Sequence, residues 1–98
     1  MATLLDDEQV KVALDELTEW HRDGDAIVRT ADLPTFPAAI ETVREVAEIA
    51  EARNHHPDID IRWRTVTFRC STHSEGGITD LDIELAKQID RVLASAPR

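Results

Sequence analysis

The sequence predicts an α+β fold with the element order α-β-β-α-β-β-α. Two kinds of periodicity lead to this prediction. Three segments carry apolar residues three or four positions apart, as on one face of a helix, and the segments between them alternate apolar and polar residues, as strands do. The packed face of the strands must meet the apolar faces of the helices. We therefore expect one domain over residues 1–98, a four-stranded antiparallel sheet with three helices packed on one face.

The first helix and the first two strands follow from local signals near the N-terminus. Asp6 opens a helix, because Gln9 follows it at the spacing of a capping box. The apolar stripe of this helix consists of Val10, Ala13, Leu14 and Leu17. An Asp-Gly pair then favours a hairpin turn between two short extended runs, which we place at residues 19–22 and 26–32.

The second and third helices have recognisable ends. The second helix should end near Arg53, because Asn54 suits a C-terminal cap and Pro57 prevents continuation. Thr79 should cap the third helix, with Asp82 three residues later in capping-box spacing. Both helices carry long apolar stripes, so both should cover the sheet.

The last two strands show a clean alternation of apolar and polar residues. Ile59, Ile61 and Trp63 alternate with polar residues, and we expect Trp63 to pack on the apolar face of the sheet. In residues 65–71 the apolar positions include Cys70, so a core position is expected for this thiol rather than a nucleophilic role. The link between the strands is very short, which predicts antiparallel pairing.

The composition limits the partners. Asp and Glu outnumber Lys and Arg by 20 to 11, and the net charge of −9 disfavours binding to nucleic acid or to anionic membranes. The one cysteine allows no intrachain disulfide and no multi-thiolate metal site. The chain starts without a basic, apolar leader and contains no apolar run of membrane-spanning length. We expect a soluble, cytoplasmic protein that binds neither nucleic acid nor membranes.

Three of the four histidines are expected to meet at one rim of the sheet. His55 and His56 lie in the corner between the second helix and the third strand, and His73 follows the fourth strand. If these strands form a hairpin, the start of one lies beside the end of the other. Imidazole titrates near neutral pH, so such a cluster is suited to general acid–base catalysis.

A metal site and a set of unrelated histidines are the two alternatives to acid–base chemistry. Three histidines with Asp82 have the chemistry of a zinc site, but neighbouring histidines usually point apart and no familiar ligand spacing is present. In the second alternative, the histidines are independent surface or capping residues, as His21 in the first hairpin is expected to be. Convergence of three imidazoles on one rim favours acid–base chemistry over both.

A longer pattern of fixed spacings surrounds the histidines. Its fixed positions are Glu51, His55, His56, Pro57, Trp63, His73 and Asp82. This pattern resembles the signature of the pterin-4a-carbinolamine dehydratase family: Glu, three residues, His-His-Pro, five residues, an aromatic, nine residues, His, eight residues and Asp. The resemblance covers nearly the whole chain, and the family's α-β-β-α-β-β-α fold agrees with the elements predicted above.

The resemblance implies a hydro-lyase that needs no metal and no organic cofactor. Its substrate is 4a-hydroxytetrahydrobiopterin, which aromatic amino-acid hydroxylases release, and its products are quinonoid dihydropterin and water, in tetrahydrobiopterin recycling. Expelling the hydroxyl needs a proton donor at oxygen, and forming the C=N bond needs a base at nitrogen 5. His55 and His73 are the candidates for acid and base, while His56 would mainly hold and polarise the pterin.

The resemblance also suggests supporting residues and partners. Glu51 and Asp82 would orient histidines through their carboxylates, and Asp82 would cap the third helix as well. Further pterin contacts are expected from Asn54, Ser71, Thr72 and Ser74, although the family often carries Asp at position 54 and an acidic residue at position 74. The family forms dimers and tetramers, so a homodimer or homotetramer is expected. Related domains also act as coactivators or assembly factors, which leaves a protein-binding module as the alternative function.

Overall fold

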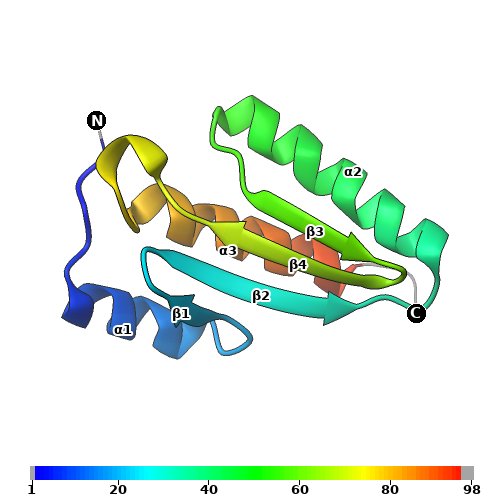
Figure 1. Ribbon diagram of the computed structural model, residues 1–98, viewed down its shortest axis with the longest axis horizontal. Coiled ribbons are helices and arrows are strands. Elements are labelled where there is room, and N and C mark those ends of the chain that lie inside the picture. Colours follow the sequence, from blue (N-terminus) through cyan, green and yellow to red (C-terminus); the bar gives the residue numbers. More distant parts are fainter. Residues whose placement is uncertain (1, 96–98) are drawn as a thin grey trace.

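The computed structural model describes residues 2–95 and shows the predicted α+β fold (Figure 1). Of the single domain expected over residues 1–98, residues 1 and 96–98 lie outside the described part. No helix in residues 2–95 is long and apolar enough to cross a membrane. The elements are α1 (Asp7–Glu16), β1 (His21–Asp23), β2 (Ala26–Asp32), α2 (Phe36–Arg53), β3 (Asp58–Arg62), β4 (Thr65–Cys70), the 3₁₀ helix η1 (His73–Glu75) and α3 (Asp80–Ala94).

The four strands form one antiparallel sheet in the order β1-β2-β4-β3, which confirms the predicted architecture. β4 therefore lies between β2 and β3, although α2 separates β2 from β3 in sequence. In Figure 1, α3 runs behind the sheet, where it packs against β4 and α2. The hairpin of β3 and β4 pairs Asp58 with Arg69, so the chain just before β3 lies next to the chain just after β4.

The hydrophobic core lies between the sheet and the helices. Phe68 and Cys70 of β4 and Ile27 of β2 are fully buried in it. The opposite face of the sheet is polar, as the alternation predicts: the hydroxyls of Thr30 and Thr67 are hydrogen-bonded at 3.0 Å across β2 and β4. The helices thus cover one face, and the histidine-bearing segments leave the sheet at its end rather than from its polar face.

The first strand is shorter and begins later than the predicted 19–22. The Trp20 N–H donates to the Leu17 carbonyl at 3.0 Å, so the turn that ends α1 continues to residue 20 and β1 starts at His21. Trp20 is buried, and its Nε1–H donates to Asp90 Oδ1 of α3 at 2.8 Å. His21 is exposed, as expected.

The prediction that Trp63 packs on the apolar face of the sheet is wrong. Arg62 and Thr65 are the last pair of the hairpin, so Trp63 and Arg64 form its two-residue turn. Trp63 has a φ of +55°, and 71% of its surface is exposed. The Arg64 guanidinium lies 4.6 Å from the centroid of the indole ring, which is a cation–π contact. The alternating pattern continued one residue beyond the strand.

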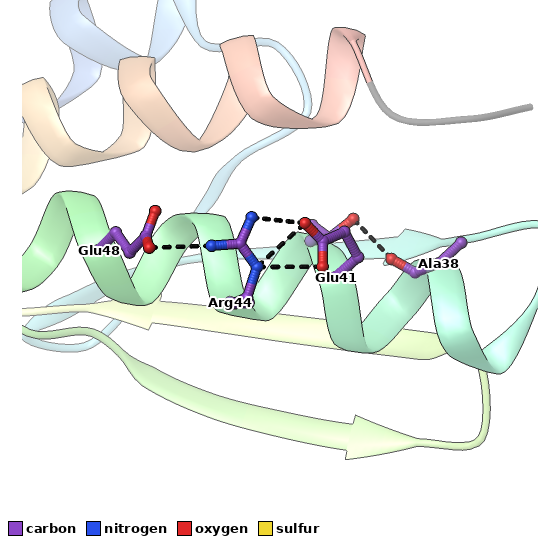
Figure 2. Close-up of polar contacts among 5 residues, drawn as sticks. Ala38, Glu41, Arg44 and Glu48 are labelled. Carbon is purple, nitrogen blue, oxygen red and sulfur yellow. Dashed lines mark hydrogen bonds and ion pairs between the residues drawn. The ribbon is translucent and has the colours of Figure 1, made fainter.

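The solvent side of α2 carries a row of charged residues (Figure 2). Arg44 donates to Glu41 one turn earlier and to Glu48 one turn later. Hydrogen bonding by Arg44 lowers the pKa of the Glu41 carboxyl, and the same contact raises the pKa of Arg44. Exposed pairs of this kind stabilise a helix only slightly. On the inner side, the buried Thr42 hydroxyl donates to the Ala38 carbonyl at 2.9 Å.

Candidate active site

The end of α2 places the two adjacent histidines. Asn54 has a left-handed conformation with a φ of +51°, which ends the helix as its cap, and α2 stops at Arg53 as predicted. The His55 N–H still reaches back to the Ala50 carbonyl at 3.1 Å. This bond fixes the backbone of His55 at the last turn of α2, immediately before the chain enters β3.

His55 is bound to a buried carboxylate. Its Nε2 lies 2.6 Å from Asp82 Oδ1 of α3. The side chain of His55 is only 11% exposed, and that of Asp82 is 0% exposed. This contact joins the end of α2 to the first turn of α3. Because neither group can easily turn toward water, the imidazole ring is held in one orientation.

The second oxygen of Asp82 is also fully engaged. Asp82 Oδ2 accepts from the Thr79 backbone N–H at 2.9 Å, which closes the capping box of α3, and from the Thr72 hydroxyl at 2.8 Å. The hydroxyls of Thr72 and Thr79 are 2.7 Å apart. Asp82 therefore has both contacts anticipated for it: one oxygen caps the helix and the other meets a histidine.

His56 has a similar partner in a different environment. Its Nε2 lies 2.8 Å from Glu51 Oε1, five residues earlier on the last turns of α2. The two side chains are 55% and 82% exposed, respectively. Solvent screens such a pair and both groups can exchange it for water. His56 is thus oriented by a contact that is easily broken.

His73 lies in the segment that follows β4. It is the first residue of η1 and is exposed. Its chain neighbour Thr72 donates a hydrogen bond to Asp82, the same carboxylate that contacts His55. The end of α2, the start of β3 and the η1 segment lie at the same end of the molecule in Figure 1. The predicted hairpin thus brings the three histidine-bearing segments to one rim.

The remaining expected site residues fall into two groups. Asn54 and Ser74 are exposed at this rim. Ser71 and Thr72 are buried, and the Ser71 hydroxyl donates to the Asp25 carbonyl at 2.7 Å. The sequence interpretation overlooked the Thr79 hydroxyl, which touches Thr72. The capping-box spacing of Thr79 and Asp82 is the signal that links this residue to the site.

The same region gives no arrangement suited to a metal ion. Within residues 2–95, no group of three or more His, Cys, Asp or Glu side chains is placed to bind one. Cys70, near Asp82, is fully buried. Burial raises the pKa of its thiol, and the charges of Asp82 and Asp58 raise it further, so little thiolate forms at neutral pH. The titratable groups that reach solvent at the rim are therefore imidazoles and carboxylates.

Comparisons with known proteins point to one family. The family model described as pterin 4 alpha carbinolamine dehydratase matches residues 3–92. A protein of Nocardia farcinica, named provisionally as a pterin-4-alpha-carbinolamine dehydratase, is 61% identical over 91% of this chain and 94% of its own length. A protein of Roseiflexus castenholzii with the same provisional name is 53% identical over 95% of this chain and 100% of its own.

A solved structure gives the same relationship. The crystal structure of a Brucella melitensis protein described as a transcriptional coactivator/pterin dehydratase superposes with a TM-score of 0.89. It is 29% identical and covers 92% of this chain and 98% of its own. Nearly the full length of each relative is matched, in sequence for the Nocardia and Roseiflexus proteins and in fold for the Brucella one. On this evidence, the chain belongs to the pterin-4a-carbinolamine dehydratase family.

Proposed function

We propose that the protein dehydrates 4a-hydroxytetrahydrobiopterin to quinonoid dihydropterin and water by general acid–base catalysis. The observation that carries the proposal is an imidazole, His55, held rigidly on a buried carboxylate at a rim shared with His56 and His73. Family membership supplies the substrate class. No oxidant or reductant is required, because the reaction removes only a hydroxyl and a proton from the pterin.

The proposed reaction uses two imidazoles in complementary states. A protonated imidazole gives its proton to the 4a-hydroxyl, and the C–O bond breaks with release of water. A neutral imidazole takes the proton from nitrogen 5, whose electron pair forms the C=N bond. Each imidazole ends in the protonation state in which the other began, so one proton transfer through solvent resets the site. His55 and His73 are assigned these two roles.

The remaining rim residues are proposed to hold the pterin. His56 is exposed and loosely held by Glu51, which suits a group that adjusts to the ring. Asn54 and Ser74 are exposed at the same rim, and Ser71 lies just before the segment that carries His73. We assign the pterin's amide-like edge to these residues.

The physiological setting follows from the same assignment. An aromatic amino-acid hydroxylase upstream would supply the 4a-hydroxypterin, and the product would re-enter tetrahydrobiopterin recycling. We propose a cytoplasmic homodimer or homotetramer, in keeping with free sheet edges at β1 and β3 and with the long exposed surface of α2.

A double variant tests the histidine assignment. The protein is expected to accelerate the decay of chemically generated 4a-hydroxytetrahydropterin. Replacing His55 and His73 by Ala should abolish most of this acceleration, with the far-ultraviolet circular dichroism unchanged. Each general acid–base group contributes about 10²–10⁴-fold, so the loss should exceed roughly 100-fold. His21→Ala removes an exposed histidine from β1 and is the matched control, expected to keep full activity. Unchanged turnover in the double variant would refute the assignment.

The alternative is a protein-binding module on the same scaffold. The Brucella melitensis relative, described as both a coactivator and a dehydratase, supports it. A module of this kind has no chemical need for an imidazole held on a buried carboxylate. Retained partner binding in the double histidine variant, together with no decay activity in the unaltered protein, would favour the module.

A further inference from the structure

We propose that Thr72 is a positioning residue that fixes the tautomer of His55. Thr72 and Thr79 bind Asp82 Oδ2 and so hold Oδ1 against His55. Oδ1 in turn keeps the imidazole proton on Nε2 and leaves Nδ1 as the atom that exchanges a proton with the pterin. The inference builds on the proposed dehydration, because it names the reacting atom of one of its catalytic groups. It assigns Thr72 a role other than contact with the pterin.

The directions of the hydrogen bonds follow from counting protons. Asp82 lies in the first turn of α3, and an ionised carboxylate can only accept hydrogen bonds. Thr72 must therefore donate its one hydroxyl proton to Asp82 Oδ2. In the 2.7 Å contact between the Thr72 and Thr79 hydroxyls, Thr79 is then the donor. The Thr79 oxygen itself accepts from the Leu81 N–H at 3.2 Å.

The same count fixes the proton of His55. Asp82 Oδ1 offers no proton, so the 2.6 Å contact requires a hydrogen on His55 Nε2. In neutral imidazole the other nitrogen is then the acceptor. Within residues 2–95 the His55 ring makes its one hydrogen bond through Nε2, which leaves Nδ1 without a partner there, and the side chain keeps a small exposed surface. Nδ1 is thus the nitrogen left for the substrate.

Burial makes this chain of bonds difficult to replace. Thr79 and Asp82 are 0% exposed and Thr72 is 4% exposed, so water has little access if a hydroxyl is removed. The backbone of Thr72 is also occupied: its N–H donates to Gly77 at 2.8 Å and its carbonyl accepts from Gly76 at 3.0 Å. Neither its side chain nor its backbone is left for a ligand. Thr72 therefore acts on the reaction through Asp82 and His55.

The test compares two substitutions at position 72 with a control. Thr72→Val keeps the shape of the side chain and removes the hydroxyl, whereas Thr72→Ser keeps the hydroxyl. The control Thr42→Val removes another buried hydroxyl, near the start of α2. Thr42 and His55 are separated by 13 positions, roughly 20 Å along a helix. All three variants are examined for folding by thermal unfolding.

Two readouts separate positioning from structure. In the decay assay, kcat of Thr72→Val should fall about tenfold with KM nearly unchanged, while Thr72→Ser and Thr42→Val should keep kcat within roughly twofold. Nitrogen-15 NMR of the imidazoles, recorded without substrate, should show protonated Nε2 in the unaltered protein and in Thr72→Ser. In Thr72→Val, Asp82 loses one of the bonds that orient it toward His55, so both tautomers become populated and the two nitrogen shifts of His55 should move toward each other.

The outcomes distinguish this inference from the proposed dehydration. A His55 that carries its proton on Nδ1 in the unaltered protein overturns the inference, even if Thr72→Val fails to fold. A Thr72→Val protein with unchanged His55 shifts and unchanged kcat overturns it as well. If the unaltered protein does not accelerate decay, the proposed dehydration fails. The NMR comparison then still decides whether Thr72 sets the tautomer.

Discussion

Two adjacent histidines at the end of α2 have the same kind of partner and opposite surroundings. His55 contacts Asp82 at 2.6 Å and His56 contacts Glu51 at 2.8 Å, so distance alone hardly separates the pairs. Asp82 is 0% exposed and accepts three hydrogen bonds, whereas the Glu51 side chain is 82% exposed and, within residues 2–95, contacts only His56. The comparison shows that burial, rather than bond length, decides which carboxylate can hold an imidazole in place.

The difference arises from where each carboxylate comes from. Glu51 lies on α2 itself, five residues before His56, so its pair is local and stays at the surface. Asp82 lies on α3, which packs against β4 and α2, so this pair forms only when the fold is complete. A local pair adjusts with its own helix, while the long-range pair fixes an imidazole relative to the sheet.

The largest effect is expected from Asp82→Asn. A carboxamide has one acceptor oxygen, so it cannot accept from His55 and also from Thr72 and Thr79. We expect kcat for pterin decay to fall on the order of 10³-fold, as when a histidine loses its correct tautomer. Losing a hydrogen bond to a buried charge should cost ~2 kcal/mol of stability, which lowers Tm by ~10 °C.

Asp80→Asn is the matched control for this substitution. It removes the same charge from the same turn of α3, at an exposed position. Its kcat should stay within roughly twofold, because within residues 2–95 its side chain forms no hydrogen bond or ion pair with a histidine. Equal losses in the two variants would mean that helix-terminal charge, and not the contact with His55, causes the effect.

The labelling rate of Cys70 measures the stability of the buried region around Asp82. The thiol is fully buried with a raised pKa, so a thiol reagent should label it only when the protein opens. In Asp82→Asn, a loss of ~2 kcal/mol should speed labelling about 30-fold under conditions where opening is a rapid equilibrium. Labelling is followed by mass spectrometry. If Asp82→Asn and the unaltered protein are labelled at the same rate, the Asp82 contacts do not stabilise the region.

The smallest effect is expected from Glu51→Gln. The pair with His56 is exposed and screened, so its loss should change the free energy of unfolding by less than ~0.5 kcal/mol and kcat by less than roughly twofold. Chemical denaturation and the decay assay measure these quantities. An effect as large as that of Asp82→Asn would remove the distinction between the two histidines.

Much of the site was predictable because its signals are local or follow from one strand pair. Asn54 and Pro57 mark the corner that holds the adjacent histidines, and the β3–β4 hairpin brings the segment of His73 to them. The capping-box spacing likewise gave Asp82 its place in the first turn of α3. Each of these inferences needs only neighbouring residues or one register.

The rest depended on how α3 docks, which no local pattern contains. The same histidine-orienting role was expected of Glu51 and Asp82, and only the packing of α3 against β4 and α2 buries the second. Thr72 was expected beside the substrate, and its hydrogen bond to Asp82 was not predicted because it forms only when α3 docks. The prediction for Trp63 was wrong for a related reason, because alternation cannot distinguish the last residue of a strand from the first residue of a turn.

The central claim is that this histidine rim dehydrates a 4a-hydroxypterin. Its most direct test is the decay rate of chemically generated 4a-hydroxytetrahydropterin, followed by absorbance, with and without a catalytic amount of the unaltered protein. We predict faster decay in proportion to protein concentration, with quinonoid dihydropterin as product. A decay rate equal to that in buffer alone would contradict the claim.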